Sequence, residues 1–345
     1  MSYNLFELNQ KGLPHLLDGV NDANDWLTKR NEIKHKWLEF IGGLPERVPV
    51  SYKVLDEIKE QDHTRLHLIY DTVYGDQVTA YLLIPDPSIP GKDQYGRRPA
   101  MLALHGTQEL GKEHYATLSG GENRRYGLQL VSRGYIVLVP DALTAGERIY
   151  DGCRSFQSKP FYEKHPNWTT VGKNIVDHMQ GVDLLSVWEG VDPNRIGVIG
   201  LSFGGYNSYF LAGIDERIRA VVSICGFSPF YGDHRPTHWG IRSWYTHLPK
   251  ITDYLSRYEV PFEFHEIAML TAPVPIFYYY GQTDAIFPHW QAIGECMAEL
   301  YKLYQFLEVG DRFEAVMTAK AHDFPPEIRT MAYDFLNRWL MEPSK

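Results

Sequence analysis

The 345-residue sequence predicts one large α/β domain, with a mostly parallel sheet of eight strands and helices on both faces. From residue 100 onward, strand-like runs alternate with helical stretches, which is typical of a parallel sheet. Two earlier runs, residues 65–71 and 77–84, are separated by the hairpin signal Gly75-Asp76, so the sheet is expected to open antiparallel. Residues 136–139 and 220–224 are apolar without alternation, as in strands buried on both sides.

An N-terminal helix is expected before the sheet. Trp26, Ile33 and Trp37 recur at helical spacing within residues 21–41, and Gly42-Gly43 marks the helix end. We therefore expect a helical extension over residues 1–50 that packs on a catalytic domain spanning residues 51–345.

Further strands and two long insertions complete the expected order. The remaining strands are predicted at residues 100–104, 135–139, 195–199, 219–224, 275–280 and 313–318. Residues 143–170 and 226–261 lack strand character and are rich in aromatic side chains. Loops this long in a compact fold are usually functional, so both insertions are interpreted as lids over a site.

Charge and composition exclude several classes of protein. The formal net charge of -9 opposes binding to a phosphate backbone, so no nucleic-acid partner is expected. The N-terminus lacks the pattern of a secretory signal, and no apolar run approaches the roughly 18 residues of a membrane helix. We predict a cytoplasmic protein with no membrane partner, in which Cys153, Cys225 and Cys296 are reduced thiols. The sequence leaves the oligomeric state open.

The segment Gly200-Leu201-Ser202-Phe203-Gly204 matches the pattern Gly-x-Ser-x-Gly. In a chain of this composition the pattern should arise by chance about once in ten sequences, so its position matters. It directly follows the predicted strand 195–199 and precedes a predicted helix over residues 206–212. This order is the nucleophile elbow of the α/β-hydrolase fold, and it predicts Ser202 as nucleophile and the Phe203 amide as an oxyanion donor.

A serine hydroxyl is too weak an acid to attack unaided, so it needs a histidine base that a carboxylate orients. The order along the chain in this fold is serine, acid, histidine. Asp284 follows the apolar run 275–280, with helix capping as the alternative role. His322 follows the run 313–318. We predict Asp284 and His322 as the acid and the base of a catalytic triad.

The second oxyanion donor is expected in the loop after strand 100–104, within His105-Gly106-Thr107-Gln108. Gly106 lets the backbone come close to a substrate, and the amide of Thr107 is the predicted donor. Gln108 is the alternative donor. His105 is interpreted as a residue that fixes the loop.

Taken together, these motifs resemble the dienelactone hydrolase and acetyl xylan esterase branch of the α/β-hydrolases. The resemblance extends from about residue 56 onward and also rests on three further segments: Arg133-Gly134-Tyr135, Gly146-Glu147-Arg148 and Val191-Asp192-Pro193-Asn194-Arg195-Ile196. Dienelactone hydrolases use a cysteine where this chain has Ser202, so the resemblance favours ester hydrolysis over lactone opening. It also implies a structural, loop-holding role for Asp141 and Glu147-Arg148, with substrate contact as the alternative.

The second insertion supplies most of the candidate substrate contacts, because aromatic side chains can exclude water and stack on a sugar or an aromatic group. A lid that packs only on itself is the alternative. The candidates are His105, Gln108, Phe227, Tyr231, Trp239 and Trp244. No metal or other cofactor is expected, because the triad needs none. Asp233, His234 and His238 do not suggest a metal site either, since Pro236 opposes the helix that a His-x-x-x-His pair requires.

These observations predict a serine hydrolase that acts on small-acyl or acetyl esters of a sugar or an aromatic alcohol, through an acyl-enzyme. The first alternative is a peptidase or amidase similar to prolyl oligopeptidase, although too few residues precede the third strand for a propeller domain. The second is a hydrolase fold kept as a non-catalytic binding protein.

Overall fold

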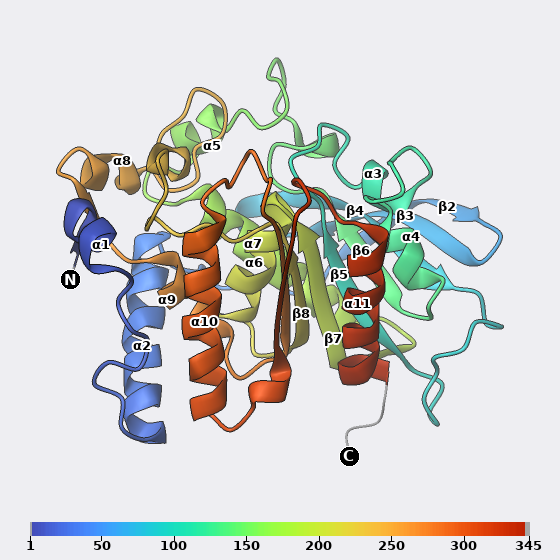
Figure 1. Ribbon diagram of the computed structural model, residues 1–345. Helices are drawn as coiled ribbons and strands as arrows, with labels where there is room; N and C mark the ends of the chain where they lie inside the picture. The colour runs from blue at the N-terminus through green and yellow to red at the C-terminus, as the bar shows by residue number, and fades with distance from the viewer. Residues whose placement is uncertain (1, 342–345) are drawn as a thin grey trace.

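A nine-stranded sheet forms the centre of the computed structural model, which describes residues 2–341 (Figure 1). The strand order is β11-β10-β8-β7-β5-β6-β4-β3-β2. The strands are β2 (Tyr52–Lys59), β3 (His63–Asp71), β4 (Gln77–Pro85), β5 (Arg98–Leu104), β6 (Ile136–Pro140), β7 (Val191–Leu201), β8 (Ile218–Ile224), β10 (Ile276–Gly281) and β11 (Phe313–Thr318). The predicted α/β-hydrolase fold is confirmed, with one strand more than the eight expected.

The sheet is antiparallel at its start and parallel thereafter. Strands β2, β3, β4 and β6 pair antiparallel in turn, whereas the pairs β5·β6, β5·β7, β7·β8, β8·β10 and β10·β11 are parallel. Side chains of β5 alternate between two hydrophobic clusters. Leu102 and Leu104 lie in one, and Met101 and Ala103 lie in the other. The central strands are therefore buried on both faces, which explains their continuous apolar sequence.

Helices cover both faces of the sheet. The main ones are α2 (Ala23–Phe40), α4 (Tyr126–Val131), α6 (Thr170–Val187), α7 (Phe203–Ala212), α9 (Phe264–Ala268), α10 (Trp290–Phe306) and α11 (Pro326–Leu336). Buried side chains of α2, α6, α7, α9 and α10 join the first hydrophobic cluster, and those of α4 and α11 join the second. In Figure 1, α10 and α11 accordingly stand on opposite sides of the strands.

Strand β2 is the strand that the sequence pattern did not reveal. All of its residues are exposed, and it lies at the edge of the sheet next to β3. Its sequence therefore lacks the alternation that a half-buried strand shows. A register shift between Val54 and Asp56 interrupts the pairing, and the charged side chains of Lys53 and Glu57 lie along the strand. Such features protect an exposed edge from pairing with another chain.

Helix α2 begins after Asp22, whose side chain accepts the amides of Asn24 and Asp25. Its apolar residues face the main body: Trp26, Ile33 and Trp37 are buried. The Trp37 ring lies 5.0 Å from that of Phe210 in α7, measured between centroids. Helix α2 thus shares its hydrophobic cluster with the sheet, while the proposed boundary at residue 50 stays a prediction.

Each insertion forms short elements above the sheet (Figure 1). The first contains α5 (Lys159–Lys164), and the second contains α8 (Lys250–Leu255) and β9 (Glu259–Val260). Strand β9 pairs antiparallel with β1 (Tyr3–Asn4), which precedes α1 (Leu5–Lys11). A short helix α3 (Glu113–Ala116) follows the loop after β5. Within residues 2–341, no helix combines the length and the apolar character needed to cross a membrane.

Candidate active site

Ser202 lies in the tight turn between β7 and α7. Its φ of 57° is in the left-handed region, which a side-chain-bearing residue adopts only when its surroundings enforce it. The Ser202 amide donates a hydrogen bond of 2.7 Å to the carbonyl of Ile224 in β8. A Cβ on Gly200 would lie 2.1 Å from the carbonyl oxygen of Gly204, and one on Gly204 would lie 2.1 Å from that of Leu104. The glycines are thus required by close backbone contacts, as the elbow motif predicts.

Asp284 and His322 lie side by side in loops that follow adjacent parallel strands. The Nδ1 atom of His322 is 2.6 Å from Oδ2 of Asp284. The other carboxylate oxygen, Oδ1, accepts the amides of Ile286 at 2.7 Å and Phe287 at 3.1 Å. Asp284 is therefore an acceptor on both oxygens and can fix the imidazole in one orientation and one tautomer.

The surroundings of Asp284 favour its ionised form. Burial raises the pKa of this carboxyl, but the hydrogen bond and charge of His322, together with the amides of Phe287 and Ile286, outweigh that effect and leave the pKa below its ordinary value. Because Asp284 stays ionised, the Nδ1 atom of His322 keeps its proton and Nε2 carries the free lone pair. That Nε2 atom is buried and has no hydrogen-bond partner within residues 2–341.

Ser202 and His322 line the same pocket, which has a volume of about 860 Å³. The predicted oxyanion residues Phe203, Thr107 and Gln108 line it as well. The amides of these three residues have no acceptor within residues 2–341, whereas the Gly106 amide donates to the Tyr115 hydroxyl at 2.8 Å. Three residues of the pocket lining thus have amides free to donate, and the choice between Thr107 and Gln108 stays open.

The second insertion, and not the first, forms the pocket wall. It contributes polar, cationic and aromatic side chains and one aliphatic side chain: Arg235, Thr237, His238, Trp239, Ile241, Arg242, Trp244 and His247. No residue between 143 and 170 lines this pocket. Two of the predicted contacts, Trp239 and Trp244, are therefore at the pocket, and Gln108 joins them from the loop after β5.

Three predicted substrate contacts lie outside the pocket lining. His105 is buried; its Nδ1 is 2.6 Å from the carbonyl of Gly106, and its Nε2 accepts the amide of Ala142 at 2.9 Å. Both ring nitrogens are thus engaged, and burial lowers the pKa of this imidazole. Phe227 is fully buried in the hydrophobic core, and Tyr231 packs against that core as a partly buried residue. None of the three lines the pocket that contains Ser202.

The charged residues after β6 hold the first insertion in place. Asp141 is fully buried and accepts Lys112 Nζ at 2.6 Å. Arg148 pairs through NH1 with Asp177 at 2.9 Å and through NH2 with Asp76 at 2.8 Å. These contacts agree with the structural role that the resemblance implied. The partners could not be foreseen, because they come from distant parts of the sequence.

Sequence reasoning missed the cationic side of the pocket. Arg124, Arg235 and Arg242 all line it, as does His247, whose Nε2 lies 2.6 Å from the Tyr206 hydroxyl. The density of arginine within the second insertion was the one available signal. It did not single out these positions, because arginine is common on exposed loops.

Cys225 lies beside the acid and base, since ligand-type atoms of Cys225, Asp284 and His322 fall within 4.8 Å of one another. These groups do not suit a metal. Burial raises the pKa of the Cys225 thiol to about 12, which disfavours the thiolate that a metal requires. The nearest atoms of Asp284 and His322 already bind each other.

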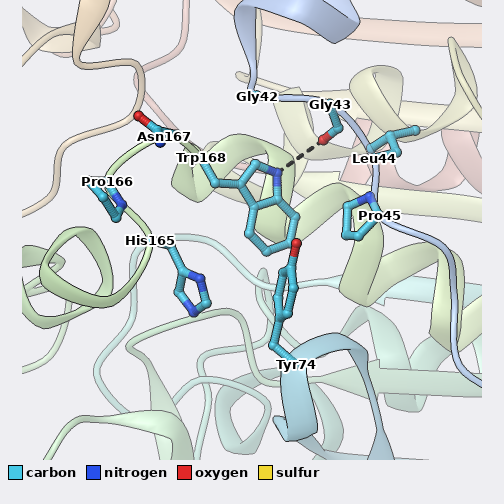
Figure 2. A pocket seen from close by; sticks show the side chains of 9 residues that line it. All are labelled: Gly42, Gly43, Leu44, Pro45, Tyr74, His165, Pro166, Asn167 and Trp168. Carbon is cyan, nitrogen blue, oxygen red and sulfur yellow. Dashed lines mark hydrogen bonds between the residues drawn. The ribbon is translucent and has the colours of Figure 1, made fainter.

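A second pocket, of about 430 Å³, shares no lining residue with the first. Figure 2 shows it between the end of α2 and the first insertion, with Tyr74 and Trp168 at its centre. The Trp168 indole donates to the carbonyl of Gly43 at 3.1 Å. Its lining contains no serine, cysteine, carboxylate, lysine or arginine, so it offers neither a serine or cysteine nucleophile nor an acid to orient a base.

The chain is similar to proteins named as hydrolases and esterases. A protein of Bacillus subtilis (strain 168) named YtaP, a candidate hydrolase, is 25% identical over 317 residues, which cover 90% of this chain and all of YtaP. A glucuronoyl esterase from Solibacter usitatus superposes with a TM-score of 0.72 at 20% identity, covering 94% of this chain and 97% of that one. Acetyl xylan esterase 1 from Thermoanaerobacterium sp. JW/SL YS485 superposes with a TM-score of 0.55 at 16% identity, covering 91% and 98%.

The two structural similarities confirm the fold that the resemblance implied. The model of the prolyl oligopeptidase family matches residues 123–322, which is more than half of the chain and includes Ser202, Asp284 and His322. By this match the chain belongs to the prolyl oligopeptidase family, within the α/β-hydrolase fold.

Proposed function

We propose that this protein is a serine esterase that hydrolyses small carboxylic esters through an acyl-enzyme. The observation that carries the proposal is the 2.6 Å pair of His322 and Asp284, whose histidine shares one pocket with Ser202 on its strained turn. Each group has the role that a serine hydrolase requires of it.

The first half of the reaction forms the acyl-enzyme. The Ser202 hydroxyl attacks the ester carbonyl while His322 Nε2 takes its proton, and Asp284 stabilises the imidazolium that results. Negative charge then develops on the carbonyl oxygen. The amides of Phe203 and Thr107 would bind that oxygen, and each such donor is typically worth about 3 to 4 kcal/mol of transition-state stabilisation.

To complete the first half, His322 gives its proton to the leaving alcohol, and the acyl group stays on Ser202. In the second half, water attacks the acyl carbonyl while His322 takes its proton, and His322 then returns that proton to Ser202 as the acid is released. An alkoxide leaves more readily than an amide anion, so esters depend less than amides on proton transfer to the leaving group. The esterase names of the superposed structures support the same preference, and they suggest an ester on a sugar.

Peptide hydrolysis is the second candidate, and membership of the prolyl oligopeptidase family favours it. A peptidase that removes residues from an amino terminus needs a carboxylate to bind the free ammonium group. Within residues 2–341, no aspartate or glutamate lines the pocket. This observation favours ester hydrolysis over aminopeptidase action.

A direct comparison of substrates tests the proposal. We expect kcat/KM for 4-nitrophenyl acetate to exceed that for aminoacyl 4-nitroanilides, with both activities lost in Ser202→Ala. Faster anilide cleavage by the unmodified protein would overturn the esterase assignment in favour of the peptidase. Absence of both activities would favour the non-catalytic alternative.

A further inference from the structure

The pocket beside Ser202 carries positive charge in a protein whose formal net charge is -9. Arg124, Arg235 and Arg242 line it, and within residues 2–341 no carboxylate does. A cleft lined by one sign of charge concentrates ligands of the opposite sign. This reversal of the overall charge occurs where the substrate must bind.

Arg242 is held in place without neutralisation. Its guanidinium lies 4.4 Å above the Trp244 ring, and its NH1 donates to the carbonyl of His238 at 3.2 Å. No carboxylate in residues 2–341 lies within 4.0 Å of it, and its Nε and NH2 groups have no acceptor there. A planar guanidinium fixed in this way is suited to bind a carboxylate through two parallel hydrogen bonds.

Arg235 is a second cation of the same segment. Its NH2 donates to the carbonyl of Ala285 at 3.2 Å, and it too has no ion-pair partner in residues 2–341. Arg124 differs, because Asp323 lies 3.7 Å from its NH1. Asp233 is a nearby acid of the second insertion: burial raises the pKa of its carboxyl and the charge of Arg235 acts in the opposite direction, although Asp233 does not contact that guanidinium. Within residues 2–341, the cation of the pocket without a nearby carboxylate is therefore Arg242.

Several partly buried arginines elsewhere in the chain pair with acids, whereas Arg98 and Arg30 bind backbone carbonyls instead. Arg217 holds Asp215 at 2.6 Å and also pairs with Asp183, and Arg195 holds Asp192 at 2.9 Å. Removing a guanidinium from water without partners is unfavourable. Arg98 satisfies its donors with several carbonyls, whereas Arg242 binds a single one and keeps donors that a ligand can occupy.

The neighbouring histidines do not offset this charge. Burial lowers the pKa of His238 to about 4, with smaller contributions from the charges of Arg242 and Arg235, although its hydrogen bond to the Arg235 carbonyl acts in the opposite direction. Burial also lowers the pKa of His247, with Arg242 contributing. Both imidazoles are therefore neutral near pH 7, and the positive potential belongs to the arginines.

We propose that the natural substrate is an ester bearing a free carboxylate, which Arg242 and Arg235 bind while Ser202 attacks the ester carbonyl. This inference rests on the proposed esterase function and names the substrate class for the same site. The carboxylate can belong to the alcohol part or to the acyl part of the ester, and the probes below distinguish the two.

Matched pairs of esters test the inference. For the alcohol part, 4-acetoxybenzoate is compared with neutral 4-acetoxybenzamide; for the acyl part, 4-nitrophenyl hydrogen succinate is compared with 4-nitrophenyl pentanoate. We expect at least one acidic ester to have a kcat/KM about tenfold or more above its neutral partner, mainly through a lower KM. Arg242→Gln should reduce that ratio by about 10- to 100-fold, and Arg242→Lys should restore part of it.

Arg257→Gln is the matched control. Arg257 also stacks on an aromatic ring, that of Tyr254 at 5.1 Å, but it is exposed and lies outside the pocket lining. Its substitution should leave the acidic-to-neutral ratio unchanged. Arg242→Glu should reverse the preference, so that an ester with a quaternary ammonium group becomes the better substrate.

A binding measurement separates this inference from the esterase proposal. Calorimetry of Ser202→Ala with 4-hydroxybenzoate and with neutral 4-hydroxybenzamide should show tighter binding of the anion, and the difference should disappear when Arg242→Gln is added. Equal affinity for 4-hydroxybenzoate and 4-hydroxybenzamide would overturn the carboxylate inference even though ester hydrolysis persists. Equal acidic-to-neutral ratios of kcat/KM in Arg242→Gln and Arg257→Gln would overturn it as well. Preferential anion binding without any ester hydrolysis would support the carboxylate site and overturn the esterase function.

Discussion

The two insertions leave the same domain, yet Arg148 of the first and Arg242 of the second have opposite surroundings. In the first, Arg148 is buried against Asp177 and Asp76, and no residue of that insertion lines the pocket. In the second, Arg235 and Arg242 line the pocket and have no carboxylate partner in residues 2–341. Both kinds of arginine carry the same charge, so charge alone does not distinguish them. An arginine paired with buried carboxylates has a structural role, whereas one without a carboxylate partner is available to bind a ligand.

The largest expected effect is the loss of ester hydrolysis when the general base is removed. His322→Ala should lower kcat/KM for any ester by about 10⁴-fold, because the general base is lost while the fold remains. The measurement is ester hydrolysis, with far-UV circular dichroism to verify folding. His234→Ala, an exposed histidine of the second insertion outside the pocket lining, is the control and should retain full activity. Similar losses in both variants would refute the assignment of His322.

The next prediction compares how much Arg148 and Arg242 contribute to folding stability. Arg148→Ala should lower the free energy of unfolding by about 3 to 5 kcal/mol, because it removes the guanidinium that pairs with Oδ2 of buried Asp177 and leaves only Lys173, among residues 2–341, to balance that carboxylate. Arg242→Ala should lower it by less than about 1 kcal/mol, since only a stacking contact and one hydrogen bond are lost. Urea denaturation measures both. Equal destabilisation by the two substitutions would show that the insertions do not differ in this way.

The third prediction concerns the pH dependence of folding stability that arises from Glu263, which binds backbone amides of the second insertion. The Glu263 carboxylate accepts the amides of Phe230 and Tyr231, each at 2.8 Å. Burial raises the pKa of Glu263 from 4.5 to about 8 despite these hydrogen bonds.

Between these pH values the folded chain holds a proton on Glu263 that the unfolded chain has lost. Stability should therefore fall as pH rises from 4.5 to 8, by at most about 1.4 kcal/mol per pH unit from this group. Urea denaturation across this range, compared with Glu263→Gln, checks the expectation. The variant should show a flatter pH dependence, and an unchanged slope would contradict the buried, protonated state.

The smallest effect concerns salt. Raising ionic strength from about 0.01 M to about 1 M should reduce the preference for a carboxylate ester by about threefold to tenfold, because Arg235 is exposed and Arg242 is only partly buried. Hydrolysis of the neutral partner ester serves as the internal control. A preference that does not change with salt would argue against an arginine-bound anion.

The sequence was most informative where strand order dictates position. Ser202, Asp284 and His322 each follow a parallel strand, and such strands end at one edge of a sheet, so their spatial proximity could be predicted without any contact being known. The glycines of the elbow could be predicted for the same reason. Local backbone geometry requires them.

Features that depend on distant partners could not be predicted. The strand β2 is exposed along its whole length and so lacks a hydrophobic period. The insertions were both interpreted as lids, because their aromatic content is similar and only packing decides which one reaches Ser202. The role of Arg242 depends on the absence of a neighbouring carboxylate, and a sequence does not show which charges meet in space.

The most direct test of the central assignment is covalent labelling of the intact protein with a fluorophosphonate, followed by mass spectrometry of the digested chain. An activated serine reacts with this reagent, whereas an ordinary serine does not. We expect one adduct per chain, on Ser202, and none in Ser202→Ala. Absence of an adduct on the unmodified protein, or an adduct that persists in Ser202→Ala, would contradict the identification of Ser202 as the nucleophile.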